Sequence, residues 1–170
     1  PMWSFYVNRG QAMGSFGVRD KNGTIMEFFP ANALYRNVER QGFRTFVRKG
    51  GRTHEIFSSV SADAAERTMT VGQNTLSVAE ENRTLGIRVS ATYFTLPGEG
   101  FAAIVRKVTV ENLTGSPMEL EMLDGLPQIL PYGVTNSDYQ AMSNLIRAWF
   151  DANNLRHNIA FYKMRASSGD

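Results

Sequence analysis

Hydrophobic and polar residues alternate most clearly just past the middle of the chain. There Met118, Leu120 and Met122 alternate with acidic residues, the period of two that is typical of a strand with one face in water. A preceding segment alternates in the same way at Val108 and Val110, and an Asn-Leu-Thr-Gly-Ser-Pro sequence lies between the two. This pattern predicts two strands joined by a turn and favours a β-sandwich.

Three further pairs of alternating segments are separated by turn residues. Asn-Gly at residues 22–23, Gly-Gly at 50–51 and Gly-Gln-Asn at 72–74 each predict a β-hairpin. The expected strands cover residues 2–7, 13–19, 24–29, 43–49, 52–57, 67–71, 75–80 and 84–96. Many short strands between turn signals favour an antiparallel sandwich or barrel over a sheet with helical crossovers.

The longest alternating segment, residues 84–96, places Ile87, Val89 and Ala91 on one face, together with Leu85 and Tyr93. Phe94 and Leu96 then fall on the opposite face. This change predicts a bulge or a bend near Tyr93.

One segment has helical rather than strand periodicity. Tyr139, Met142, Ile146 and Trp149 recur at helical spacing, as do Leu145 and Phe150. Asn-Ser-Asp at residues 136–138 supplies capping side chains, and Asn153-Asn154 is a plausible end. A helix is therefore expected over residues 137–152, docked on a sheet by this apolar stripe rather than exposing the stripe to stack on sugars.

Composition narrows the classes of function. The chain has 170 residues, 42% of them hydrophobic, and a formal net charge of +2 with the two signs interspersed. The densest basic stretch, residues 36–52, reads as solvated strand faces and a turn, and no nucleic-acid-binding motif accompanies it. No run approaches the length of a membrane span. We therefore expect one globular domain, or part of one, with neither nucleic acid nor membrane as a partner.

The side chains that carry chemistry are few. The chain has no cysteine, and its two histidines, His54 and His157, lack metal-ligand spacing, so no metal and no cofactor are predicted. His54 and Glu55 are consecutive on an expected strand and would point apart. The paired acids Glu80-Glu81 would also point apart, and Glu119 and Glu121 share the wet side of a strand. Asp124 is expected to close a turn rather than to catalyse. No catalytic residue is predicted.

Residues 123–133, Leu-Asp-Gly-Leu-Pro-Gln-Ile-Leu-Pro-Tyr-Gly, resemble a segment of glycoside hydrolase family 94, the cellobiose-phosphorylase-like proteins formerly called glycosyltransferase family 36. Residues 16–23 followed by 29–32 are similar to the early hairpin of the same family, and the run from Met142 to residue 167 also fits. The segment lies in the family's N-terminal β-sandwich. The resemblance therefore implies a galactose-mutarotase-like supersandwich, mainly β and antiparallel, with one docked helix.

The resemblance also implies a function for residues 1–170. In this family an (α/α)-barrel after the sandwich carries the catalytic acid and the phosphate site, and it acts on β-linked glucosyl disaccharides, usually by phosphorolysis. The chain is too short to contain that barrel, so no catalytic residue is carried over. We expect a fragment: a non-catalytic N-terminal accessory domain of a phosphorylase- or hydrolase-like enzyme, with the barrel as its partner. The family commonly dimerises with help from the sandwich, and the resemblance favours a cytoplasmic location.

Two other interpretations stay open. A stand-alone carbohydrate-binding module would stack sugars on exposed aromatic residues, for which Trp3, Tyr132 and Tyr162 are the candidates. A pure assembly domain would bind no sugar and would form a concentration-dependent dimer.

Overall fold

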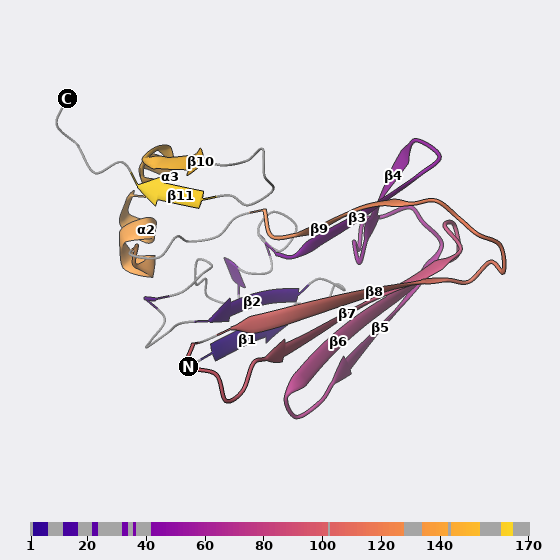
Figure 1. Cartoon of the computed structure of the whole chain (residues 1–170), viewed down its shortest axis with the longest axis horizontal. Coiled ribbons are helices and arrows are strands. Elements are labelled where there is room, and N and C mark those ends of the chain that lie inside the picture. Colours follow the sequence, from indigo (N-terminus) through magenta and orange to yellow (C-terminus); the bar gives the residue numbers. More distant parts are fainter. Residues whose placement is uncertain are drawn as a thin grey trace.

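The strands between Arg44 and Gly125 form two facing β-sheets in the computed structural model (Figure 1). The structure describes residues 2–6, 12–16, 22–23, 32–33, 36, 42–101, 103–127, 134–142, 144–153 and 161–164. Within these ranges no helix is long and apolar enough to cross a membrane.

The described elements are mainly strands. In chain order they are β1 (Met2–Tyr6), β2 (Ala12–Phe16), β3 (Arg44–Lys49), β4 (Arg52–Ile56), β5 (Ala65–Val71), β6 (Thr75–Asn82), β7 (Ile87–Thr95), β8 (Ile104–Asn112), β9 (Glu121–Gly125), α2 (Asn136–Met142), α3 (Asn144–Ala148), β10 (Phe150–Asn153) and β11 (Phe161–Met164).

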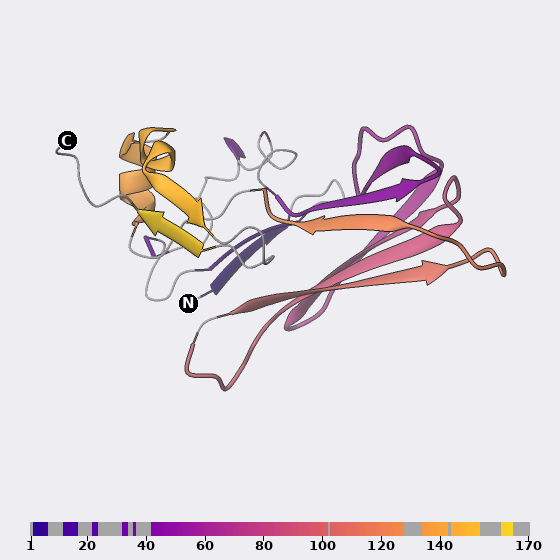
Figure 2. The same ribbon diagram turned by 45° about the horizontal axis from the view of Figure 1, so that its top comes forward.

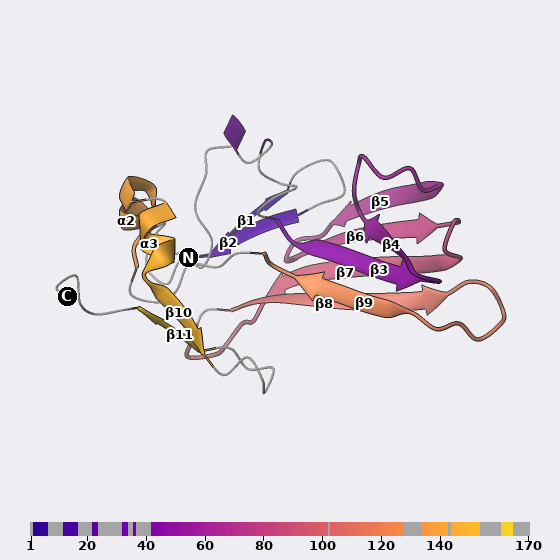
Figure 3. The same ribbon diagram turned by 90° about the horizontal axis from the view of Figure 1, so that it is seen from above.

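Two antiparallel sheets form the two layers. A three-stranded sheet has the order β4-β3-β9, and a four-stranded sheet has the order β5-β6-β7-β8. Figures 2 and 3 show the three-stranded sheet lying over the four-stranded one. The antiparallel pairs β1–β2 and β10–β11 form two separate two-stranded sheets. The expected mainly β, sandwich-like class is confirmed.

The core lies between the two layers because each sheet turns an apolar face inward. On β7 the predicted stripe is buried: Ile87, Val89 and Ala91 have no exposed surface, and Tyr93 is 4% exposed. The other buried members of this cluster are Val47 and Ile56 of the three-stranded sheet, Val78 of β6, and Phe57 and Leu85. The alternation in the sequence thus identified the core face correctly.

Two of the predicted hairpins are confirmed. Gly50 and Gly51 connect β3 to β4 with φ angles of 56° and 80°, a left-handed backbone that favours glycine. Residues 72–74 connect β5 to β6, and the Gly72 N–H donates to the Thr75 carbonyl at 2.8 Å. The first expected strand is confirmed as β1. The expected strand at residues 24–29 lies outside the described residues.

The strands on either side of the Asn-Leu-Thr-Gly-Ser-Pro sequence do not pair with each other. β8 pairs with β7 in the four-stranded sheet, whereas β9 pairs with β3 in the other layer. Asn112 and Gly115 still make a turn, in which the Asn112 side chain donates to the Ser116 carbonyl at 2.7 Å. The connection crosses between layers because Met118 and Leu120 pack into the core before β9 begins.

The bulge predicted near Tyr93 is absent. β7 pairs without interruption from Ile87 to Phe94 with β6 and to Thr95 with β8. Phe94 simply lies half-buried on the outer face of the sheet. The apolar positions change face at Phe94 because this residue lies on the outer face, and not because the strand contains a bulge.

The helix expected over residues 137–152 is described as two short helices, and only its last turn is wrong. α2 and α3 are short, and Phe150–Asn153 forms strand β10, which pairs with β11. Tyr139 and Ile146 are buried with Val134, as the apolar stripe predicted, whereas Leu145 is 56% exposed. Ladder hydrogen bonds to β11 replace the last helical turn, and Asn153 is in a strand rather than at a helix end.

The cap of α2 begins one residue before the predicted capping residues. The Thr135 hydroxyl accepts from the Asp138 N–H at 3.1 Å, and the Asp138 carboxylate accepts from the Thr135 N–H at 3.2 Å. This reciprocal pair is a capping box, which satisfies two backbone donors at the helix start.

Candidate functional site

One polar cluster joins the two sheets around Arg106 of β8, whose side chain is only 6% exposed. Its guanidinium donates to the Tyr93 hydroxyl at 2.8 Å, to the Thr45 hydroxyl at 2.9 Å and to the Asp124 carboxylate. Thr45 in turn donates to Asp124 at 2.6 Å. Every member therefore has a partner, and the cluster holds β8 and β7 against β3 and β9.

Aromatic rings enclose the guanidinium of this cluster. The Arg106 Cζ lies 5.3 Å from the ring centre of Phe43 and 5.4 Å from that of Tyr93, within cation–π range. Burial raises the pKa of Tyr93, and the nearby Arg106 only partly offsets this. Asp124 lies within strand β9 and is the counter-ion of the buried Arg106. The expectation that Asp124 closes a turn is therefore wrong.

A second polar cluster lies around Glu80 of β6, whose side chain has no exposed surface. Its carboxylate accepts from the Phe57 N–H at 2.7 Å, from Arg67 Nε at 2.8 Å and from the Asn82 amide at 3.0 Å. Phe57 has a φ of 64°, an uncommon angle for a bulky residue. The buried carboxylate therefore holds the strained start of the β4–β5 connection.

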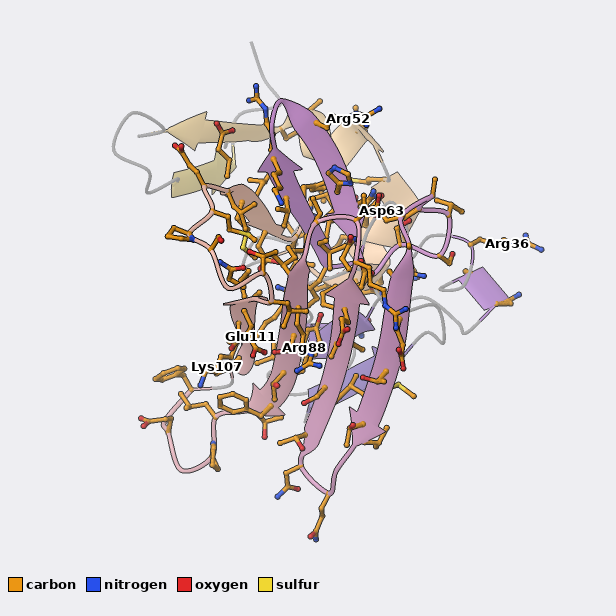
Figure 4. The ribbon with its side chains drawn as sticks, turned by 90° about the vertical axis from the view of Figure 1, so that its right-hand side faces the viewer. Arg36, Arg52, Asp63, Arg88, Lys107 and Glu111 are labelled. Atoms are coloured by element: carbon orange, nitrogen blue, oxygen red, sulfur yellow. The ribbon has the colours of Figure 1, made fainter. Side chains whose placement is uncertain are left out.

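The same network continues to a histidine through Asn82. The Asn82 amide donates to both Glu80 and Asp63, and the Asp63 carboxylate lies 2.8 Å from His54 Nδ1. Figure 4 shows Asp63 well apart from the Arg88–Glu111 pair of the four-stranded sheet. Burial raises the pKa of Asp63, but the Asn82 and His54 contacts outweigh it, so that pKa is lowered below 3.8.

Replacing Asp63 by asparagine is expected to make the free energy of unfolding depend less on pH in the acid range. Because the pKa of Asp63 is lowered in the folded state, the ionised carboxylate stabilises the protein at pH values above 3.8. This contribution is lost as the pH falls below that value. Urea unfolding between about pH 6 and about pH 3 measures the slope. Glu99→Gln, in an exposed turn, is the control, and an unchanged slope in Asp63→Asn would contradict the assignment.

The third feature is a groove on the outer face of the three-stranded sheet, which faces away from the core. Phe46 of β3 pairs with Leu123 of β9, and Leu123 is 70% exposed. The groove has a volume of about 280 Å³. It is lined by Arg44, Phe46, Leu123, Asp124, Gly125, Leu126 and Pro127.

The charges beside this groove are already paired. Arg44 Nε lies 2.5 Å from Glu55 of β4, and its guanidinium lies 5.1 Å from the Phe46 ring centre. Glu121 pairs with Arg48 at 3.1 Å. With its charges neutralised, the groove offers a mainly apolar surface.

The outer face of the four-stranded sheet is different. Three of its aligned rows carry mainly hydroxyl and charged side chains: Thr68, Ser90 and Thr109; Thr70, Ser77, Thr92 and Lys107; Glu66, Glu81, Arg88 and Glu111. A fourth row, at one end of the sheet, holds Thr75, Phe94 and Val105. Arg88 contacts Glu81 at 2.8 Å and Glu111 at 3.5 Å, and Figure 4 shows Arg88 and Glu111 together. Of the two outer faces, the three-stranded one is therefore the candidate functional site.

The aromatic candidates for sugar stacking fall on different sheets or outside the described residues. Trp3 lies in β1 opposite Ser15, and Tyr162 lies in β11 opposite Ala152. Tyr132 and His157 lie outside the described ranges. Whether Trp3, Tyr132 and Tyr162 bind sugar stays a prediction.

The two consecutive pairs, His54-Glu55 and Glu80-Glu81, point to opposite faces of their strands, as predicted. His54 faces the core and Glu55 the outer side, as their order on a strand predicted. Glu80 is buried and Glu81 pairs with Arg88 outside. Across the described ranges, no group of three His, Asp or Glu side chains is placed to hold a metal ion.

Sequence reasoning missed Asp63, Asn82, Arg67 and Arg106 as members of the two clusters. A signal existed for Asn82, which has the same parity as buried Val78 on one strand and must therefore face inward. Arg106 likewise shares the parity of Val108. No local pattern marks Asp63, because it lies in a connection.

No protein-family model matches the chain, and no curated protein is significantly similar to it in sequence.

Proposed function

We propose that this chain is a non-catalytic, N-terminal accessory domain of a glycoside phosphorylase- or hydrolase-like enzyme, and that it docks a helical-barrel catalytic domain of the same protein. One observation carries the proposal. Leu123, Leu126 and Pro127, from the segment that resembles glycoside hydrolase family 94, line an exposed apolar groove. An apolar groove beside neutralised charges is the kind of surface that packs against another domain.

The contrast between the two outer faces supports docking through the three-stranded sheet. The four-stranded sheet presents rows of hydroxyl groups and ion pairs to solvent, a composition that suits contact with water. On the three-stranded sheet, the half-buried Phe46 of the central strand lies beside the exposed Leu123 of β9 instead. Both inter-sheet clusters have their charges matched internally, which suits a rigid support.

The docking test begins with the coding sequence downstream of Asp170 in the parent gene. The encoded region is expressed separately, and its binding to residues 1–170 is measured by titration calorimetry. Phe46→Ser should weaken binding at least about tenfold, since buried aromatic residues dominate interfaces. Phe94→Ser is the matched control, because Phe94 is also a half-buried phenylalanine, on the outer face of the other sheet. Equal effects of the two variants would contradict docking through the groove.

The carbohydrate-binding alternative makes the opposite prediction for the isolated chain. Titration with gluco-oligosaccharides should show no binding if the domain is only a support. Binding in the millimolar range or tighter that is lost in Trp3→Ala or Tyr162→Ala would favour the stand-alone module instead. Release of sugar 1-phosphate from cellobiose by the purified chain would overturn the non-catalytic assignment.

A further inference from the structure

We draw no further inference here: the strongest candidate, the apolar surface on the inner faces of β8 and β9, where Val110 is 40% and Met122 is 42% exposed, carries none because nothing in the described part of the chain shows what covers it.

Discussion

Replacing Glu80 by alanine is expected to destabilise the protein by about 3–5 kcal/mol, the usual effect of removing one partner from a buried ion pair. The fully buried carboxylate holds three donors: the Phe57 N–H, Arg67 Nε and the Asn82 amide. Its loss leaves a half-buried guanidinium without a counter-ion and a strained backbone donor without an acceptor. Urea unfolding, followed by tryptophan fluorescence, measures the change.

Two controls separate this role from a general effect of mutation on the strand. Glu81→Ala alters the next residue of β6, which faces solvent and pairs with Arg88, and should have a much smaller effect. Glu80→Leu combined with Arg67→Leu removes both charges and should recover part of the stability. A Glu80→Ala variant as stable as Glu81→Ala would refute the structural role of the carboxylate.

Replacing Asp124 by alanine is expected to cost about 2–4 kcal/mol, somewhat less than for a fully buried pair because the carboxylate is 25% exposed. The substitution leaves Arg106 nearly buried with only the neutral hydroxyls of Tyr93 and Thr45 as partners. The free energy of unfolding from urea titration measures the effect.

A double-mutant cycle with Arg106→Met completes this test. If Asp124 and Arg106 interact directly, the double variant should be more stable than the sum of the single losses predicts. Strict additivity would show that the two residues stabilise the fold independently, and the inter-sheet cluster would then lose its main contact.

The sequence located strands better than it located their partners. Alternation is a local property, so Ile87, Val89 and Ala91 could be assigned to the core from their spacing alone. The same pattern gives no information on which strand lies alongside. The segments at Val108 and Met122 were therefore expected to be neighbours, although they belong to opposite layers.

Tertiary contacts explain the other differences. The helical spacing from Tyr139 to Phe150 is real, but pairing of Phe150–Asn153 with β11 ends the helix early. The groove was not predictable, because it joins Phe46 to residues more than seventy positions away. The part of the basic stretch that lies in β3 and β4 is on strand faces as expected, and there Arg44 and Arg48 pair with Glu55 and Glu121. Residues 37–41 of that stretch lie outside the described residues.

The crossing from β8 to β9 also sets an order of folding. The meander β5-β6-β7-β8 is built from consecutive hairpins, so its contacts close short loops and form quickly. β9 must instead find β3 across the whole meander, with Thr45 and Asp124 79 positions apart in the chain. Closing a longer loop costs more entropy. During synthesis the four-stranded sheet can therefore form before β3 has paired with β9. Once β9 has left the ribosome, it can pair with β3, and this pairing completes the core and buries Val47.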